Sequence, residues 1–146
     1  MTTIEIPEAY GYVVMTGALS VLVTTFLGIQ VTLYRNEAKV PLPFLYAEKS
    51  EVEKDEKKMI FNCYQRAHQN SLETQPQVLF MLAMTGLKYP LFASGVGLVW
   101  VIGRIFFASG YQTGRPANRS RGGFGHFAYF TLIGSTIVTA FSILFY

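Results

Sequence analysis

Three long stretches of the sequence carry almost no charge, and they limit the folds open to this chain. Residues 9–34 and 124–146 contain no Asp, Glu, Lys or Arg, and residues 91–111 contain only Arg104. A helix needs about 20 apolar residues to cross the hydrocarbon core of a bilayer. Each stretch is therefore long enough to span a membrane.

The composition of the 146-residue chain supports this interpretation and excludes several other classes of protein. Hydrophobic residues make up 51% of the chain and charged residues 14%, whereas an average soluble domain has about 25% charged residues. The aromatic content excludes intrinsic disorder, and the single Cys63 excludes a disulfide scaffold. The Lys and Arg residues lie mainly in loops rather than in a stripe, so nucleic acid is not an expected partner.

A fourth segment, residues 59–87, is polar in its first half and apolar in its second half. No β-type alternation persists in the sequence, and helices satisfy their own backbone groups in lipid. The acidic residues before the first apolar stretch, without Lys or Arg, argue against a signal peptide. We therefore expect an all-α membrane protein, a four-helix transmembrane bundle forming one domain over residues 1–146. The expected helices cover residues 9–34, 59–87, 91–111 and 124–146.

The distribution of Lys and Arg predicts how this bundle is oriented. Nine of these residues lie in the loops 35–58 and 112–123, whereas the connection between the second and third segments carries only Lys88. Loops rich in Lys and Arg remain in the cytosol, so we expect both basic loops to be cytosolic and both termini to lie on the other side. Residues 40–44 contain two prolines and are not expected to be helical. The charged run 48–58 either forms a solvated helical turn or stays mobile.

Three polar residues of the second segment share one helix face. Arg66, Asn70 and Glu73 are spaced i, i+4, i+7, and Arg104 and Tyr111 lie two turns apart in the third segment. Charges inside a membrane must face protein or a wet cavity, so these side chains either lock the helices together or bind a ligand. Two arginines against one glutamate favour an anionic ligand, because arginine binds carboxylate and phosphate groups bidentately.

Several short motifs, in this order along the chain, are typical of one membrane family. The run RAHQNSLE at 66–73 and the run RIFFASGY at 104–111 resemble the second-helix and third-helix signatures of the membrane-associated proteins in eicosanoid and glutathione metabolism (MAPEG). The longer run 61–73, with YGYV at 10–13 and RSRG at 119–122, is most similar to the microsomal glutathione S-transferase 3 branch. The resemblance implies a homotrimer of the endoplasmic reticulum membrane. It also implies a glutathione site between subunits that opens to the cytosol and to the bilayer.

The resemblance further implies roles for individual residues. Arg119, in an Arg-Ser step after the third helix, resembles the arginine that activates the thiol of glutathione. Arg115 and Arg121 are the alternatives, because the length of this loop varies within the family. The glutathione-binding residues implied by the resemblance are Arg35, Arg66, Asn70, Glu73, Arg104 and Tyr111. Four positions depart from the family or from its leukotriene C4 synthase branch: Asn36, His68, Thr74 and Phe107.

Together these features predict an enzyme, a microsomal glutathione S-transferase with glutathione peroxidase or leukotriene C4 synthase activity as further options. Its co-substrate would be glutathione, and its acceptor a lipophilic electrophile or lipid hydroperoxide from the membrane. No metal is expected, because His68 and His126 lie far apart without ligand-type companions. The alternative is a non-enzymatic scaffold that resembles the lipoxygenase-activating protein and presents lipid to a partner. The implied glutathione ligands and an arginine after Tyr111 favour the enzyme.

Overall fold

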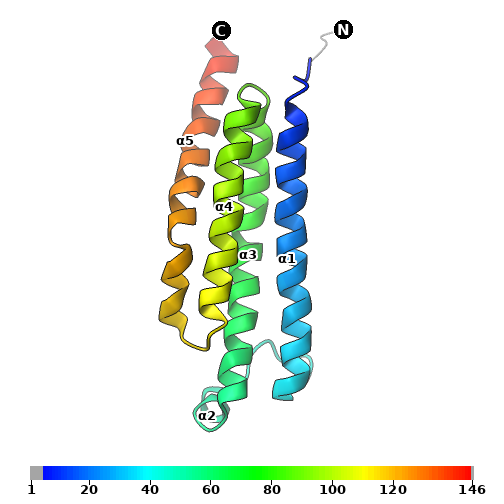
Figure 1. Ribbon diagram of the computed structural model, residues 1–146, viewed down its shortest axis with the longest axis vertical. Helices are drawn as coiled ribbons and strands as arrows, with labels where there is room; N and C mark the ends of the chain where they lie inside the picture. The colour runs from blue at the N-terminus through cyan, green and yellow to red at the C-terminus, as the bar shows by residue number, and fades with distance from the viewer. Residues whose placement is uncertain (1–4, 146) are drawn as a thin grey trace.

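The computed structural model describes residues 5–145, and in this part of the chain all regular structure is helical. Four long helices run up and down beside one another (Figure 1). They are α1 (Tyr10–Ala38), α3 (Glu56–Gly86), α4 (Pro90–Tyr111) and α5 (Phe124–Phe145). Two short helices lie in the loops between them: α2 (Lys49–Val52) and the 3-10 helix η1 (Pro116–Gly122). The predicted all-α class is therefore confirmed. Tyr146, the last residue of the predicted fourth helix, lies outside the described residues.

Local capping extends two helices beyond the apolar stretches that predicted them. The first helix continues to Ala38 and ends where Lys39 takes the left-handed conformation, with a φ of 53°. Helix α3 starts at Glu56 because the side chain of Asp55 accepts a hydrogen bond of 2.9 Å from the backbone N–H of Lys57. Hydropathy marks only the apolar part of a helix, whereas these ends depend on capping.

Three of the four long helices, α1, α4 and α5, are long and apolar enough to cross a membrane. The helix α3 is not apolar enough by the same measure, because its first half is polar. Large apolar side chains on the outer surface are strongly exposed, among them Met15 at 71%, Phe127 at 78% and Leu144 at 74%. Such a surface is stable in lipid and not in water, so the chain is a membrane protein.

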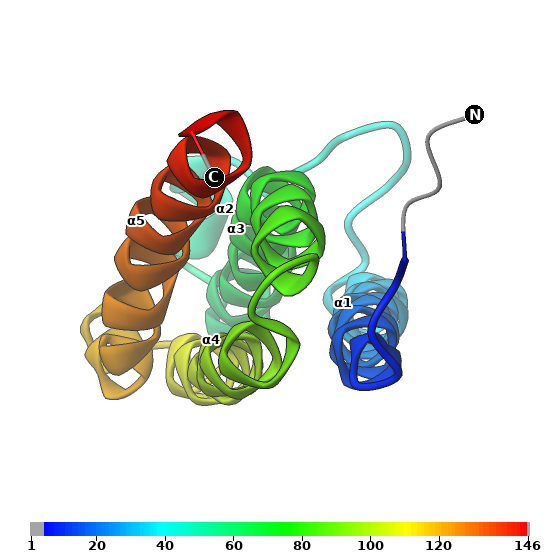
Figure 2. The same cartoon turned by 90° about the horizontal axis from the view of Figure 1, so that it is seen from above.

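The helices α3 and α4 each pack against all three other long helices, as the view down the bundle shows (Figure 2). The largest core cluster joins α3, α4 and α5, and it contains Val78, Met81, Trp100, Val101, Ala128 and Leu132. Smaller clusters attach α1 to α3 and α4, for example Leu27 with Ala67 and Ala108. A polar face on α3 is therefore held in place by apolar packing on the other sides of that helix.

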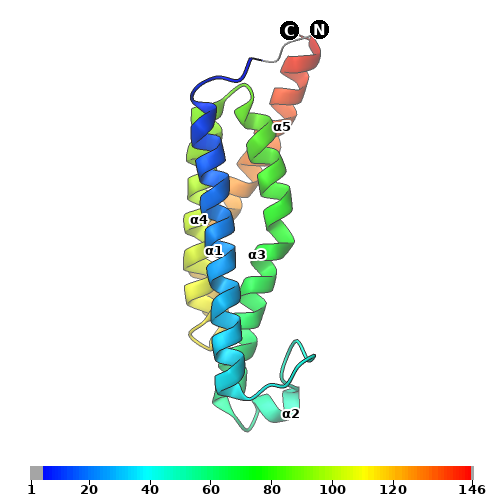
Figure 3. The same ribbon diagram turned by 90° about the vertical axis from the view of Figure 1, so that its right-hand side faces the viewer.

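The two basic loops lie at the same end of the bundle, opposite the described ends of the chain (Figures 1 and 3). The short turn between α3 and α4 lies at the other end, beside the start of α1 and the end of α5. Arg66, which precedes the middle of α3, thus lies in the half of the bundle nearer the basic loops. Most charged residues therefore lie in the half of the bundle nearer the basic loops or close to its middle, whereas Glu5, Glu8 and Lys88 lie at the opposite end.

The contact between α4 and α5 depends on glycine at its closest point. A Cβ atom on Gly103 would lie 2.6 Å from the Cα of Gly125, whereas a Cβ on Gly95, in the same helix, would meet nothing within 4 Å. We predict that Gly103→Ala lowers the stability of the protein in detergent by about 1–3 kcal/mol, because the two backbones must separate. Thermal unfolding measures this loss. Gly95→Ala is the control and should leave the unfolding temperature unchanged or raise it slightly; equal effects of both variants would contradict the prediction.

Candidate functional site

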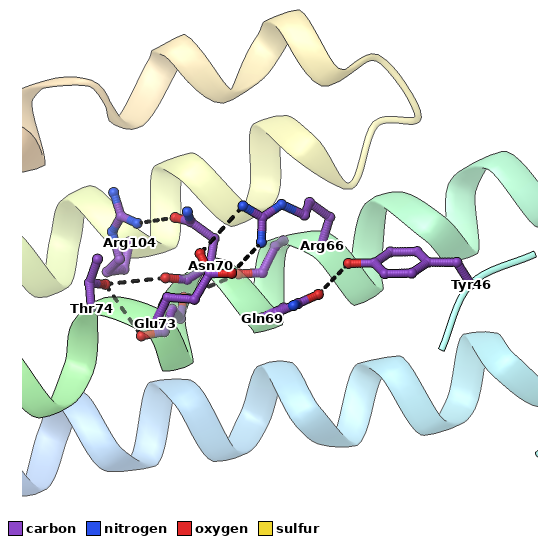
Figure 4. A network of polar contacts seen from close by, with 9 residues as sticks. Tyr46, Arg66, Gln69, Asn70, Glu73, Thr74 and Arg104 are labelled. Atoms are coloured by element: carbon purple, nitrogen blue, oxygen red, sulfur yellow. Dashed lines mark hydrogen bonds and ion pairs between the residues drawn. The ribbon is translucent and has the colours of Figure 1, made fainter. Parts of the chain in front are cut away.

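An ion pair lies along the polar face of α3. The guanidinium of Arg66 donates to both carboxylate oxygens of Glu73, at 2.8 and 3.3 Å (Figure 4). Their spacing of seven residues allows this contact on one face of the helix, as the sequence predicted. In the single chain the two side chains are 38% and 46% exposed. The pair is therefore accessible to a ligand or to another copy of the chain.

Arg104 approaches the same face from α4 but is itself almost completely buried, with 3% exposure. Its Nη1 donates to Oδ1 of Asn70 at 2.7 Å, and its Nε has no hydrogen-bond partner among the described residues. The rings of Phe107 and Trp100 flank the guanidinium, with centroids at 4.5 and 5.8 Å. No ion pair in residues 5–145 includes Arg104. Arg104 thus lies behind Asn70, and a neutral amide provides its only hydrogen bond to the described chain.

A tyrosine that the sequence analysis did not identify also reaches this face. Tyr46 belongs to the loop between α1 and α2, and its hydroxyl donates to Oε1 of Gln69 on α3 (Figure 4). Burial raises the pKa of Tyr46, the Arg66 guanidinium opposes that rise, and Glu73 and Tyr111 add to it. These side chains are therefore close enough to influence one another. The hydroxyl of Tyr46 stays protonated at neutral pH and can act as a hydrogen-bond donor.

Arg35 contacts the loop that follows α1. It lies in the last turn of α1, and its Nη1 donates to the carbonyl oxygens of Phe44 at 2.6 Å and Val40 at 3.4 Å. Its guanidinium also lies over the ring of Phe61, 4.8 Å from the centroid. In the single chain, Arg35 thus contacts the loop that carries Tyr46, and its hydrogen bonds within the described residues do not reach Arg66 or Glu73.

The three arginines after α4 differ in their relation to Tyr111. The guanidinium of Arg119 lies 5.9 Å from the centroid of the Tyr111 ring, and its Nη1 donates to the carbonyl oxygen of Pro116 at 3.1 Å. All three arginines, at 115, 119 and 121, are exposed at the surface. Tyr111 is half-buried against Leu27, Ala67 and Ala108. The helix η1 therefore brings Arg119 close to Tyr111 at the end of α4.

Cys63 and the two histidines have ordinary structural contacts. Cys63 is buried in α3, and the ring of His68 lies against the backbone of Gly28 on α1. His126 is exposed and makes a hydrogen bond to the carbonyl oxygen of Gly123. Within residues 5–145, no group of three or more His, Cys, Asp or Glu side chains is arranged to hold a metal ion.

The site can bind an anion that also carries a positive group. Arg66 uses only some of its five N–H donors on Glu73, so donors remain for a carboxylate or phosphate. Glu73 is exposed and can accept from an ammonium group. The exposed Arg119 on η1 lies close to Tyr111 at the end of α4, so it can place a positive charge next to a reacting group there.

Comparison with known proteins gives one family. A model of the MAPEG family matches residues 13–141, a range that contains α3, α4 and η1 completely and almost all of α1 and α5. The match therefore covers every residue of the site described above.

The burial of Arg104 leads to a prediction about stability that can be tested without a ligand. Asn70→Ala removes the only hydrogen-bond acceptor of a buried guanidinium, and we expect a loss of about 1–3 kcal/mol in stability in detergent. Replacing both residues, as in Asn70→Ala with Arg104→Met, removes the charge as well and should cost less than Asn70→Ala alone. Asn36→Ala, at an exposed position of α1, is the control. If thermal unfolding shows the double variant to be the least stable, Arg104 does not depend on Asn70 in this way.

Proposed function

Because this chain belongs to the MAPEG family, we propose that it is a membrane-bound enzyme that uses glutathione, of the microsomal glutathione S-transferase 3 branch. The family uses glutathione, and it includes glutathione transferases, leukotriene C4 synthase and the lipoxygenase-activating protein. The proposed reactions are the conjugation of glutathione to lipophilic electrophiles and the reduction of lipid hydroperoxides.

The observation that carries the proposal is the charge balance of the α3 face. Two guanidinium groups, those of Arg66 and Arg104, stand against one carboxylate, that of Glu73, beside apolar packing. A surplus positive charge that is partly shielded from water by apolar packing is stabilised by an anionic ligand. Glutathione has two carboxylates, an ammonium group and a thiol, so it supplies both the anion for Arg66 and the cation for Glu73. We assign its binding to Arg66, Asn70, Glu73 and Tyr111, with Arg104 supporting Asn70.

The exposure of the Arg66–Glu73 pair supports a site between subunits. Lipid cannot solvate an exposed ion pair, so another surface must cover this face of α3 in the membrane. Proteins of this family form trimers. We propose a homotrimer in which a neighbouring copy covers the α3 face. Arg35 uses only its Nη1 on the carbonyl oxygens of Val40 and Phe44, so its other N–H donors remain for the glutathione of a neighbour.

The proposed chemistry needs a thiolate, because the thiol form of glutathione is a weak nucleophile. A guanidinium cannot remove the proton at neutral pH, so Arg119 would act by holding the negative charge of the sulfur. In conjugation the thiolate forms the S–C bond and the leaving group departs with its electron pair. In peroxide reduction two glutathione molecules are oxidised to the disulfide, and the hydroperoxide becomes an alcohol and water.

The orientation and location follow from the same proposal. With the basic loops 35–58 and 112–123 on the cytosolic side of the endoplasmic reticulum membrane, the site opens towards the cytosol.

The second candidate function, a non-enzymatic scaffold that presents lipid, predicts no turnover. Purified protein in detergent, assayed with glutathione and either an aryl halide or a fatty-acid hydroperoxide, distinguishes the two: we expect turnover with at least one acceptor, and none would favour the scaffold.

Glutathione affinity tests the role of Arg66. We predict that Arg66→Ala weakens glutathione binding about 10–100-fold, because a hydrogen bond to a charged group is lost from the site. Isothermal titration of the folded variant in detergent measures the change. Lys54→Ala, which removes an exposed charge from the basic end, is the matched control and should bind like the unmodified protein. Unchanged affinity in a well-folded Arg66→Ala protein would remove this residue from the site.

The thiolate proposal predicts a different kinetic effect at Arg119. We expect Arg119→Ala to lower kcat about 100-fold with a much smaller change in the Kd of glutathione, since the contact stabilises the reactive ionised form. The ultraviolet absorbance of bound thiolate should fall in parallel. Arg115→Ala and Arg121→Ala are controls from the same loop and should keep both signals. If one of them loses both signals instead, that residue takes the catalytic role; if all three variants keep them, arginine does not activate the thiol.

A further inference from the structure

A proline-containing strap, residues 39–47, joins the end of α1 to α2 and is fixed at both of its ends. Arg35 donates to the carbonyl oxygens of Val40, near the start of the strap, and of Phe44, in its second half. At its end the side-chain amide of Asn62 pairs with Ala47, accepting from the backbone N–H at 2.8 Å and donating to the carbonyl oxygen at 3.0 Å. Two side chains of the strap, Val40 and Ala47, are buried in a core cluster with Phe61.

These contacts determine where Tyr46 lies. It directly precedes Ala47, the residue that Asn62 holds, so its position is fixed relative to α3. The aromatic ring leans towards the polar face, and the hydroxyl meets Gln69 on the side where Arg66 lies (Figure 4). The strap therefore presents a phenolic hydroxyl next to a guanidinium, on a face whose other polar groups come from α3 and α4.

The chemistry of this pair suits a carboxylate. The hydroxyl of Tyr46 now donates to a neutral amide oxygen, and a carboxylate is a stronger acceptor for the same proton. Arg66 retains free N–H donors beside it. One carboxylate can thus receive a hydrogen bond from each residue, with Gln69 released or shared.

We infer that Tyr46 is a further glutathione-binding residue, whose hydroxyl joins Arg66 in holding one carboxylate of the peptide, and that Arg35 and Asn62 position it through the strap. This inference rests on the proposed function, because it takes glutathione as the ligand. It adds to the site a residue from outside the long helices.

The test compares glutathione with two analogues, each lacking one of its carboxylates, in the unmodified protein and in Tyr46→Phe. We expect Tyr46→Phe to weaken the binding of glutathione about tenfold, since a hydrogen bond to a charged acceptor is lost. For the analogue that lacks the contacted carboxylate, the two proteins should bind equally. Tyr12→Phe, which removes an exposed hydroxyl at the other end of α1, is the control and should bind all three ligands like the unmodified protein.

Three other results would overturn the inference. Equal binding of glutathione by Tyr46→Phe and the unmodified protein excludes Tyr46 from the site. An equal loss for all three ligands shows that Tyr46 only supports the fold of the strap. A loss accompanied by faster hydrogen exchange in residues 39–47 leads to the same conclusion. If the unmodified protein itself fails to bind glutathione, the proposed function fails, and this outcome is distinct from a failure at Tyr46.

Discussion

Arg104 places a positive charge between α3 and α4, where almost no solvent reaches it. A buried guanidinium needs a hydrogen-bond acceptor, and here the acceptor is Asn70 on the neighbouring helix. The two helices must therefore pack in the register that brings these residues together. Asn70 lies one turn from both Arg66 and Glu73, so the same register fixes the polar face that Tyr46 contacts through Gln69.

Much of this arrangement could be predicted from the sequence, because it depends on periodicity and hydropathy. The apolar stretches indicated the long helices, and the spacing of Arg66 and Glu73 indicated a shared face. The pairing of Arg104 with Asn70 was not predicted, since spacing within one helix does not determine the register between two. The relation of Arg119 to Tyr111 depends on the short helix η1, which leaves no apolar pattern in the sequence.

Tyr46 shows where sequence reasoning reaches its limit. The path of the strap is set by side chains that bind backbone groups, Arg35 on Phe44 and Asn62 on Ala47. Such contacts require no particular residue type in the strap itself, so neither composition nor spacing reveals them. The two prolines indicated correctly that residues 40–44 are not helical, but they could not indicate which face of α3 the following tyrosine would meet.

The divided character of α3 has a consequence for how the protein enters the membrane. The first half of α3 carries the polar face. The helix as a whole is therefore not apolar enough to be identified as a membrane span by hydropathy, whereas α1, α4 and α5 are. The insertion machinery of the cell recognises segments largely by their hydrophobicity. The connection to α4 is only a short turn, and α4 is strongly apolar. In the four-span topology proposed above, α3 enters the bilayer together with α4 as a helical hairpin, and Arg104 becomes buried as these two helices pack against each other.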